Sequence, residues 1–153
     1  MPNSPDHAVL RLERFLPYRL SVLSNRVSQD IAALYSKRFA LGITEWRVMA
    51  VLGHEHNLSA NQVAERTAMD KVAVSRAVSQ MLEKKLLLRQ THGQDRRRSE
   101  LKLSAKGYAV FDQIVPLALA YERQIMSALP AQEQNQLLAI LDKLEAAELA
   151  LKP

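Results

Sequence analysis

The chain has 153 residues, of which 48% are hydrophobic and 24% charged, as in an ordinary globular protein that can bury a core. It contains no cysteine, which excludes disulfides, thiolate nucleophiles, cysteine zinc sites and thiol redox sensors. No apolar run approaches the roughly 18 residues of a membrane span, and the first residues, MPNSPDHAVLRLER, lack the apolar core of a signal peptide. We therefore expect a cytoplasmic protein with no membrane partner.

The positive charge is concentrated in one segment. The whole chain carries a net charge of +5, whereas residues 71–106 contain ten Lys or Arg and three Asp or Glu, a net charge of +7. The other residues together are therefore mildly acidic. A local basic segment is typical of a nucleic-acid interface; on charge alone, a solvated basic face without a partner is the alternative.

The N-terminal pattern is helical. Apolar residues from Phe15 to Leu34 recur at steps of three and four, which predicts a short helix, a break near Leu16, and a long helix over residues 17–38. Pro17 suits the first turn of that long helix. Gly42 should end this unit.

Two short helices follow. Thr44 is the expected N-cap of a second helix that stops near Gly53. Ser59 is the expected N-cap of a third helix over residues 60–67. A short helix, a tight turn and another helix would form a helix-turn-helix.

The helix that completes this motif is predicted over residues 71–85. One face is apolar and should be buried, with the residues Val74, Val78, Met81 and Leu82. The opposite face carries small or hydrogen-bonding side chains and, as we interpret it, no bulky apolar residue: Lys71, Ala73, Ser75, Arg76, Ser79 and Gln80. Arg can pair with guanine and Gln with adenine in the major groove, while Ser and Lys can bind phosphates. Taken alone, such a face could equally be the solvent side of a bundle helix.

A β-hairpin with a basic tip is predicted next. LLLRQT (86–91) and SELKL (99–103) are short and partly alternating, and HGQDRRR (92–98) lies between them. Beside a recognition helix, such a wing can place an arginine in the minor groove, where A·T tracts concentrate negative potential. Strand alternation would direct Arg97 opposite to Arg96 and Arg98, and Asp95 could pair with one arginine and orient it.

Two leucine-rich helices should close the chain. Ser104 is the expected cap of a fifth helix that runs to about Ala128 with a kink at Pro116, and Leu129-Pro130 should break it. A last amphipathic helix follows, with one face marked by Leu137, Leu141, Leu144 and Glu148. The terminal helices are too apolar to remain solvated, which predicts that the chain pairs with a second copy as a homodimer.

Four stretches resemble the MarR (multiple antibiotic resistance regulator) family. DRRRSELKLS (95–104) is similar to its wing signature D-R-R-x-x-x-L-x-L-T/S, and LGITEWRVM (41–49), VSR (74–76) and LEKK (82–85) also match. The likeness runs from about Phe15 to Ala147. At Leu86 the chain departs from the family, whose members commonly carry Gly there, so the start of the first wing strand could differ.

The resemblance implies a winged-helix homodimer that binds a pseudo-palindromic operator in double-stranded DNA. Its interface would be built from the first, fifth and sixth helices. Members usually repress nearby genes and release DNA on binding a small aromatic or phenolic anion. By this carry-over Arg76 reads bases, Arg97 enters the minor groove and Asp95 orients the wing.

We thus expect a mainly α fold: a winged helix-turn-helix over residues 41–104, flanked by dimerisation helices in residues 1–40 and 105–153. An effector site is expected where the dimer helices meet the DNA-binding part. Aromatic rings and arginines that could hold a carboxylated aromatic ring lie near this junction: Tyr18, Arg19, Arg26, Phe39, Trp46 and His54. The alternative is that the aromatic residues are core and the arginines solvated.

Other chemistry has little support in the sequence. His54 and His56 are two residues apart and would point to different sides of a helix, so we expect no metal site. No nucleophile motif or phosphate-binding glycine loop is present, so we expect neither an enzyme nor a cofactor. The competing function is a winged-helix protein-interaction or architectural module without ligand control.

Overall fold

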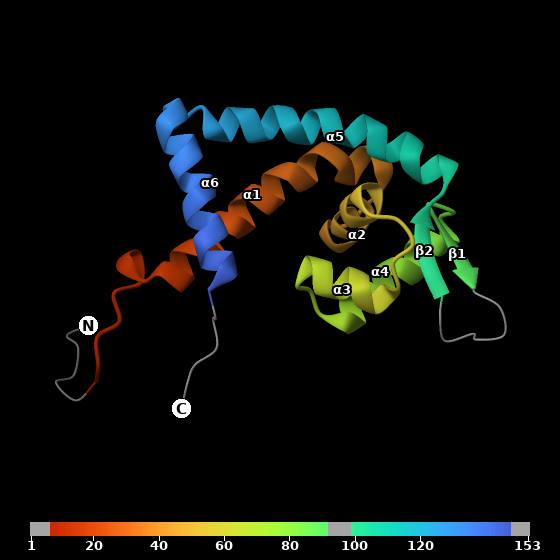
Figure 1. Cartoon of the computed structure of the whole chain (residues 1–153), viewed down its shortest axis with the longest axis horizontal. Helices are drawn as coiled ribbons and strands as arrows, with labels where there is room; N and C mark the ends of the chain where they lie inside the picture. The colour runs from red at the N-terminus through yellow and green to blue at the C-terminus, as the bar shows by residue number, and fades with distance from the viewer. Residues whose placement is uncertain (1–6, 92–98, 148–153) are drawn as a thin grey trace. The chain divides into compact units, whose positions relative to one another are not determined.

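The structure, a computed structural model, describes residues 7–91 and 99–147. It is mainly helical with one two-stranded sheet, and it confirms the predicted winged-helix fold (Figure 1). The elements in chain order are η1 (Leu12–Arg14), α1 (Leu16–Phe39), α2 (Ile43–His54), α3 (Ala60–Thr67), α4 (Lys71–Glu83), β1 (Leu87–Thr91), β2 (Ser99–Leu103), α5 (Ala105–Met126) and α6 (Ala131–Ala146).

The N-terminal elements agree with the predicted break near Leu16, but the expected short helix is only the single 3-10 turn η1. Helix α1 begins at Leu16 with Pro17 in its first turn, where a missing backbone N–H costs no helical hydrogen bond. It ends at Phe39, and the left-handed Ala40, with φ of 53°, turns the chain toward α2.

The predicted cap of α2 is wrong, whereas the cap of α3 is confirmed. Helix α2 begins at Ile43 with Gly42 at the N-cap, two residues before the predicted cap Thr44. The Glu45 carboxylate fixes this start, because it accepts the Gly42 N–H at 3.3 Å. At α3, Ser59 Oγ accepts the Gln62 N–H at 3.1 Å and Gln62 Oε1 accepts the Ser59 N–H at 2.9 Å.

Helix α4 is held at both ends. The Ala73 N–H donates to Asp70 Oδ2 at 3.0 Å, which caps its start. It ends at Glu83, two residues before the predicted end, because Lys85 has a positive φ of 59°. The Lys85 and Leu86 N–H groups donate to the Leu82 and Met81 carbonyls at 3.0 and 2.9 Å, the pattern of a Schellman motif. The residue in the left-handed conformation is therefore Lys85, and Leu86 needs no glycine.

The wing is built into the hydrophobic core. Strands β1 and β2 pair antiparallel, from Leu87 opposite Leu103 to Thr91 opposite Ser99, which confirms the predicted hairpin strands. Leu87, Leu101 and Leu103 are buried together with the apolar faces of α2, α3 and α4. The Leu101 N–H also donates to the Leu58 carbonyl at 2.7 Å, so the segment before α3 is joined to the wing.

Ser104 caps α5 as predicted and also joins the helix to the end of α4. Its hydroxyl donates to the Lys85 carbonyl at 2.6 Å and accepts the Gly107 N–H at 2.9 Å. A Cβ at Gly107 would lie 2.2 Å from the Leu86 carbonyl oxygen, so only glycine allows this close approach. Helix α5 is thereby packed directly onto the residues that lead from α4 into the wing.

By its contacts the chain divides into residues 1–115 and 116–153. The boundary falls at Pro116, inside α5, which continues to Met126 rather than to Ala128. In the second unit the Gln134 side chain donates to the Met126 and Leu129 carbonyls at 2.9 and 3.0 Å and closes the turn before α6. Glu148, expected on the face of α6, lies outside the described residues.

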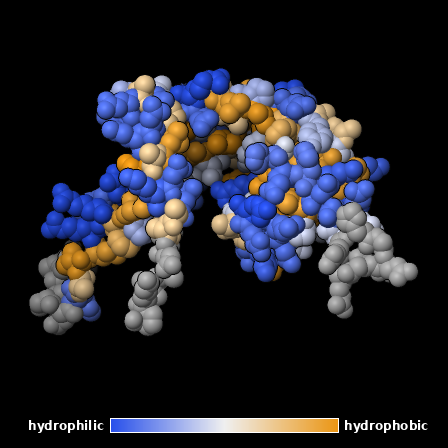
Figure 2. Space-filling view, viewed as in Figure 1, coloured by the Kyte–Doolittle hydropathy of each residue, from blue (hydrophilic) through white to orange (hydrophobic). Residues whose placement is uncertain are grey.

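Apolar side chains remain exposed in both units. Of the described residues in α1 only Tyr35 is buried, and α6 has no buried residue. Figure 2 shows hydrophobic side chains along the N-terminal part of α1. The exposed residues include Phe15, Leu16, Leu20 and Leu23 near α1, and Leu137, Leu138, Ile140, Leu141 and Leu144 in α6.

No helix in the described part of the chain is both long enough and apolar enough to cross a bilayer.

Candidate DNA interface and effector cavities

Helix α4 presents a polar face to solvent. Val74, Ala77, Val78 and Met81 are buried beneath the helix and fix its orientation. Five of the six predicted DNA-contacting residues on α4 are exposed, namely Lys71, Ser75, Arg76, Ser79 and Gln80, whereas Ala73 is half-buried at the edge of this face. The arrangement leaves the guanidinium, amide and hydroxyl groups of α4 free to meet base edges and phosphates.

One residue contradicts our interpretation that this face lacks a bulky apolar side chain. Val72, in the first turn of α4, is 60% exposed. With Arg76 and Ser79 it occupies positions i, i+4 and i+7, which lie on one stripe of a helix. The helical spacing in the sequence places Val72 on this stripe as well.

The start of α2 borders the exposed face of α4. A hollow of about 290 Å³ separates them, lined by Gly42, Ile43, Thr44 and Glu45 from the start of α2 and by Ala73, Arg76, Ala77 and Gln80 from α4. The exposed face of α4 is therefore continuous with the start of α2 rather than isolated.

The buried carboxylate of Glu45 holds the end of α4 against the segment that joins α1 to α2. Glu45 is 7% exposed, and its Oε2 lies 2.9 Å from Lys84 Nζ. The same ammonium donates to the Ala40 carbonyl at 2.8 Å. Through Lys84, which follows the last residue of α4, this helix is thus tied both to the end of α1 and to the start of α2, so its exposed face cannot shift without breaking a part-buried charged contact. Sequence reasoning missed this pair, since its members are 39 residues apart.

The wing strands are described, but the basic tip is not. Arg89 on β1 is exposed and Lys102 on β2 is half-buried. Asp95, Arg96, Arg97 and Arg98, for which we predicted DNA contacts, lie outside the described residues.

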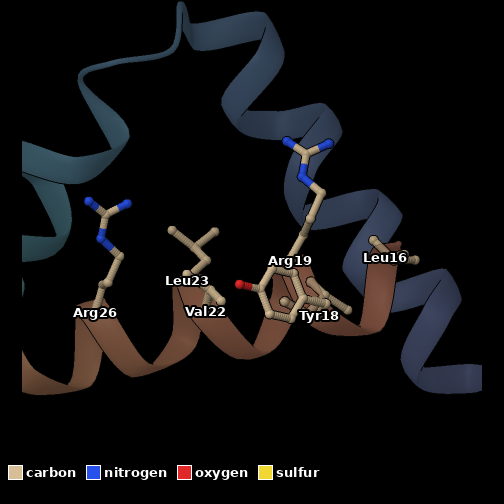
Figure 3. A pocket seen from close by; sticks show the side chains of 7 residues that line it. Leu16, Tyr18, Arg19, Val22, Leu23 and Arg26 are labelled. Atoms are coloured by element: carbon tan, nitrogen blue, oxygen red, sulfur yellow. The ribbon is translucent and has the colours of Figure 1, made fainter. Parts of the chain in front are cut away.

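Three of the six expected effector residues line one cavity along α1 (Figure 3). Arg19 and Arg26 extend to the same side of the helix, with Leu23 between them. The cavity has a volume of about 500 Å³ and is mostly apolar, with two guanidinium groups and one phenol; its lining residues are Leu16, Tyr18, Arg19, Leu20, Val22, Leu23 and Arg26. Such a lining could accept an apolar ring that carries a negative charge.

A second, smaller cavity lies between α1 and α2. It has a volume of about 90 Å³ and contains Trp46; the other lining residues are Ser28, Ile31, Tyr35, Ile43 and Arg47. The Arg47 side chain donates to Ser28 Oγ at 3.1 Å. Burial raises the pKa of Tyr35, and the nearby Arg47 charge partly offsets this effect. Arg47 was missed in the sequence, where its signal was a lone cation in the otherwise apolar run WRVMAVL.

The remaining expected effector residues lie elsewhere. Phe39 packs against the core with the Arg38 guanidinium 5.2 Å from its ring centroid, and His54 is exposed at the end of α2. Neither residue lines the two cavities described above. His56 lies after α2, with its Nδ1 3.2 Å from the Tyr108 hydroxyl. Within residues 7–91 and 99–147 no three His, Asp or Glu side chains are grouped as metal ligands.

Comparison with known proteins agrees with this geometry. The MarR family model matches residues 41–98. The HTH-type transcriptional regulator BilQ of Clostridium symbiosum is 27% identical over 93 residues, which cover 61% of this chain but only 65% of that relative.

Solved structures share the fold over nearly the whole chain. A MarR/EmrR family transcriptional regulator from Acinetobacter sp. ADP1 has a TM-score of 0.81 and 27% identity, covering 89% of this chain and 96% of that one. BpsR of Bordetella bronchiseptica, whose DNA binding is regulated by 6-hydroxynicotinic acid, has a TM-score of 0.79 at 20% identity, covering 92% and 100%. With its winged-helix core and its exposed α4 face, the chain is similar to the MarR family of transcription regulators, whose family model matches residues 41–98.

Proposed function

We propose that the protein is a homodimeric transcriptional repressor that binds a pseudo-palindromic DNA operator and releases it on binding a small aromatic or phenolic acid. The observation that carries this proposal is the exposed face of α4, polar around Arg76 and fixed from behind by the buried Val74, Val78 and Met81. A recognition helix needs such a face, held rigidly, to read base edges in the major groove.

The apolar faces of α1 and α6 support a second copy of the chain as the partner. Leucines at 40–60% exposure, such as Leu16, Leu20, Leu23 and Leu138, are unfavourable in water over so many adjacent turns. A two-fold dimer would bury them and present two α4 helices to one face of DNA, about 10 base pairs apart. The operator would then be pseudo-palindromic, because it mirrors the two-fold axis.

The wing would add a second groove contact. Arg97 is proposed to enter the minor groove, with Arg96 or Arg98 on a phosphate and Asp95 as the group that orients them. The burial of Leu101 and Leu103 supports this, because it would hold the wing strands firmly beside α4.

The α1 cavity supports an aromatic acid as effector. Its volume of about 500 Å³ is within the range of roughly 300–1,000 Å³ that ligand pockets occupy. The 90 Å³ cavity at Trp46 is smaller than the roughly 150 Å³ known to hold a benzene molecule, so it would have to open to accept a ring. The regulation of BpsR by 6-hydroxynicotinic acid is a precedent in a protein of the same fold.

In this mechanism the acid binds better to a dimer whose two α4 helices no longer match the operator spacing. DNA affinity then falls by the coupling free energy between the two sites, and DNA weakens effector binding by the same factor. Because the cavity lies on α1, a helix expected in the interface, its occupation is placed to change how two copies pair.

The test is binding of the purified protein to DNA from its own upstream region, at about 100–200 mM salt with excess competitor DNA. The same measurement is repeated with a panel of aromatic carboxylates. Tight binding that one compound releases would support the full proposal, and Arg26→Ala should then bind DNA but resist release. Weak binding with a steep salt dependence and no sequence preference would favour an architectural module, and no DNA affinity would favour a protein-interaction module.

A further inference from the structure

Val72 is an apolar residue on the exposed face of α4, outside the hydrophobic core. It is 60% exposed, whereas the other two valines of α4, Val74 and Val78, are 1% exposed. Asp70 caps the helix through the Ala73 N–H, so the first turn, and Val72 with it, is fixed in place. Valine also has a lower helix propensity than Arg, Lys, Gln or Glu, so local helix stability does not explain its presence here.

The direction of Val72 is set by the helix itself. It shares a stripe with Arg76 and Ser79, one and two turns further along, on the side opposite to the buried residues Val74 and Met81. If Arg76 meets base edges, Val72 faces the same groove from the first turn. The N-terminal residues of recognition helices are those that approach the bases most closely.

Only one group in the major groove is recognised by an apolar side chain. Guanine, cytosine and adenine present hydrogen-bonding atoms there, whereas thymine presents a C5-methyl group beside its O4 acceptor. Contact between the two Val72 methyl groups and a thymine methyl would remove apolar surface of both molecules from water.

We propose that Val72 contacts the C5-methyl group of one thymine in each half-site and is thereby a specificity-determining residue. This inference rests on the proposed DNA-binding function of α4. It adds a preference for T that neither Arg76 nor Gln80 can supply, since their pairing partners are guanine and adenine.

The experiment replaces each thymine of the operator, singly and in both half-sites, with deoxyuridine, which removes only the methyl group. The duplex is one selected from a random pool by the wild-type dimer, and affinity is measured by fluorescence anisotropy. For the wild-type protein one substitution should weaken binding about fourfold per half-site, the effect of one methyl group left unburied. For Val72→Ser the same duplex and its deoxyuridine version should bind equally, and Val72→Thr should fall between.

Leu88→Ser is the matched control. Leu88 is an exposed apolar residue of the same unit, 47% exposed, but it is on the wing strand β1 rather than on α4. Leu88→Ser should retain the full deoxyuridine effect, because thymine methyl groups lie in the major groove and the wing is proposed to contact the minor groove. Thermal unfolding should be nearly unchanged for Val72→Ser, because the side chain is outside the core.

An equal deoxyuridine effect in wild type and Val72→Ser, or no effect at any thymine in the wild type, would overturn this inference while DNA binding itself stands. Failure to select any duplex from the pool would refute DNA binding by α4, and the role of Val72 with it.

Discussion

The contact between Lys84 and Glu45 should be a principal stabiliser of the winged-helix core. Lys84 Nζ makes two charge-assisted hydrogen bonds, at 2.9 Å to Glu45 and 2.8 Å to the Ala40 carbonyl. Lys84→Ala would leave the Glu45 side chain, 9% exposed, with the Gly42 N–H at 3.3 Å as its remaining described partner. An unpaired, largely buried carboxylate is costly because water replaces the lost ammonium only in part.

The loss in the free energy of unfolding for Lys84→Ala can be estimated from these contacts. Hydrogen bonds to charged groups contribute about 1.5–3 kcal/mol each, but Lys84 is itself 37% exposed, so solvent screens part of the interaction. We therefore expect Lys84→Ala to lower the free energy of unfolding by about 2 kcal/mol. In a chain of this size that corresponds to a fall in Tm of roughly 4–8 °C.

The assay is urea unfolding followed by circular dichroism at fixed protein concentration, since pairing of chains would shift the midpoint. Lys37→Ala is the control, because Lys37 is an exposed lysine in the last turn of α1, where its positive charge lies near a helix C-terminus. Lys84→Ala should cost clearly more than Lys37→Ala. Glu45→Gln combined with Lys84→Ala should show a coupling of about 1 kcal/mol or more. Equal losses in the two lysine variants, or additive effects in the double variant, would refute the reasoning.

Three further predictions concern the chain beyond that pair. Lys85→Gly should raise the free energy of unfolding by about 1 kcal/mol, since φ of 59° strains a residue with a Cβ; a lower midpoint would contradict the assigned turn. Gly107→Ala should lower it by about 3 kcal/mol or more, because a Cβ would lie 2.2 Å from the Leu86 carbonyl oxygen, and a neutral result in the same urea assay would exclude this close packing. The hydrogen bond from Arg66 lowers the pKa of Glu55 below its ordinary 4.5. The ion pair between the two side chains therefore stabilises the fold above pH 4.5, and this stabilisation is lost as the pH falls through the lowered pKa. Glu55→Gln should therefore be less stable than wild type near neutral pH and equal to it in acid, whereas a pH-independent difference would show that the ion pair is not its cause.

Much of the fold follows from local sequence rules. Ser59 and Ser104 were predictable caps, since each is a short hydroxyl residue directly before a periodic segment, and the structure gives both the expected hydrogen bonds. Thr44 met the same criterion and is not a cap, because Glu45 could reach back to the Gly42 N–H instead. Residue type alone does not decide between two candidate caps that are two residues apart.

The candidate site was less predictable, because it depends on packing between distant segments. Arg76 and Ser79 could be placed on an exposed face from helical spacing, and the same spacing would have placed Val72 there. In contrast, Tyr18 and Trp46 line different cavities, a separation that depends on how α1 packs on α2 and that no local pattern encodes.

The central claim is that α4 reads DNA through Arg76, and one comparison tests it most directly. Wild type, Arg76→Ala and the control Arg123→Ala, a change in the last turn of α5, are titrated with the selected operator and with a scrambled duplex. Arg76→Ala should weaken operator binding by about 1–3 kcal/mol, roughly 5- to 150-fold, and change scrambled-duplex binding little, while Arg123→Ala behaves as wild type. Equal operator affinity for wild type and Arg76→Ala would contradict the account.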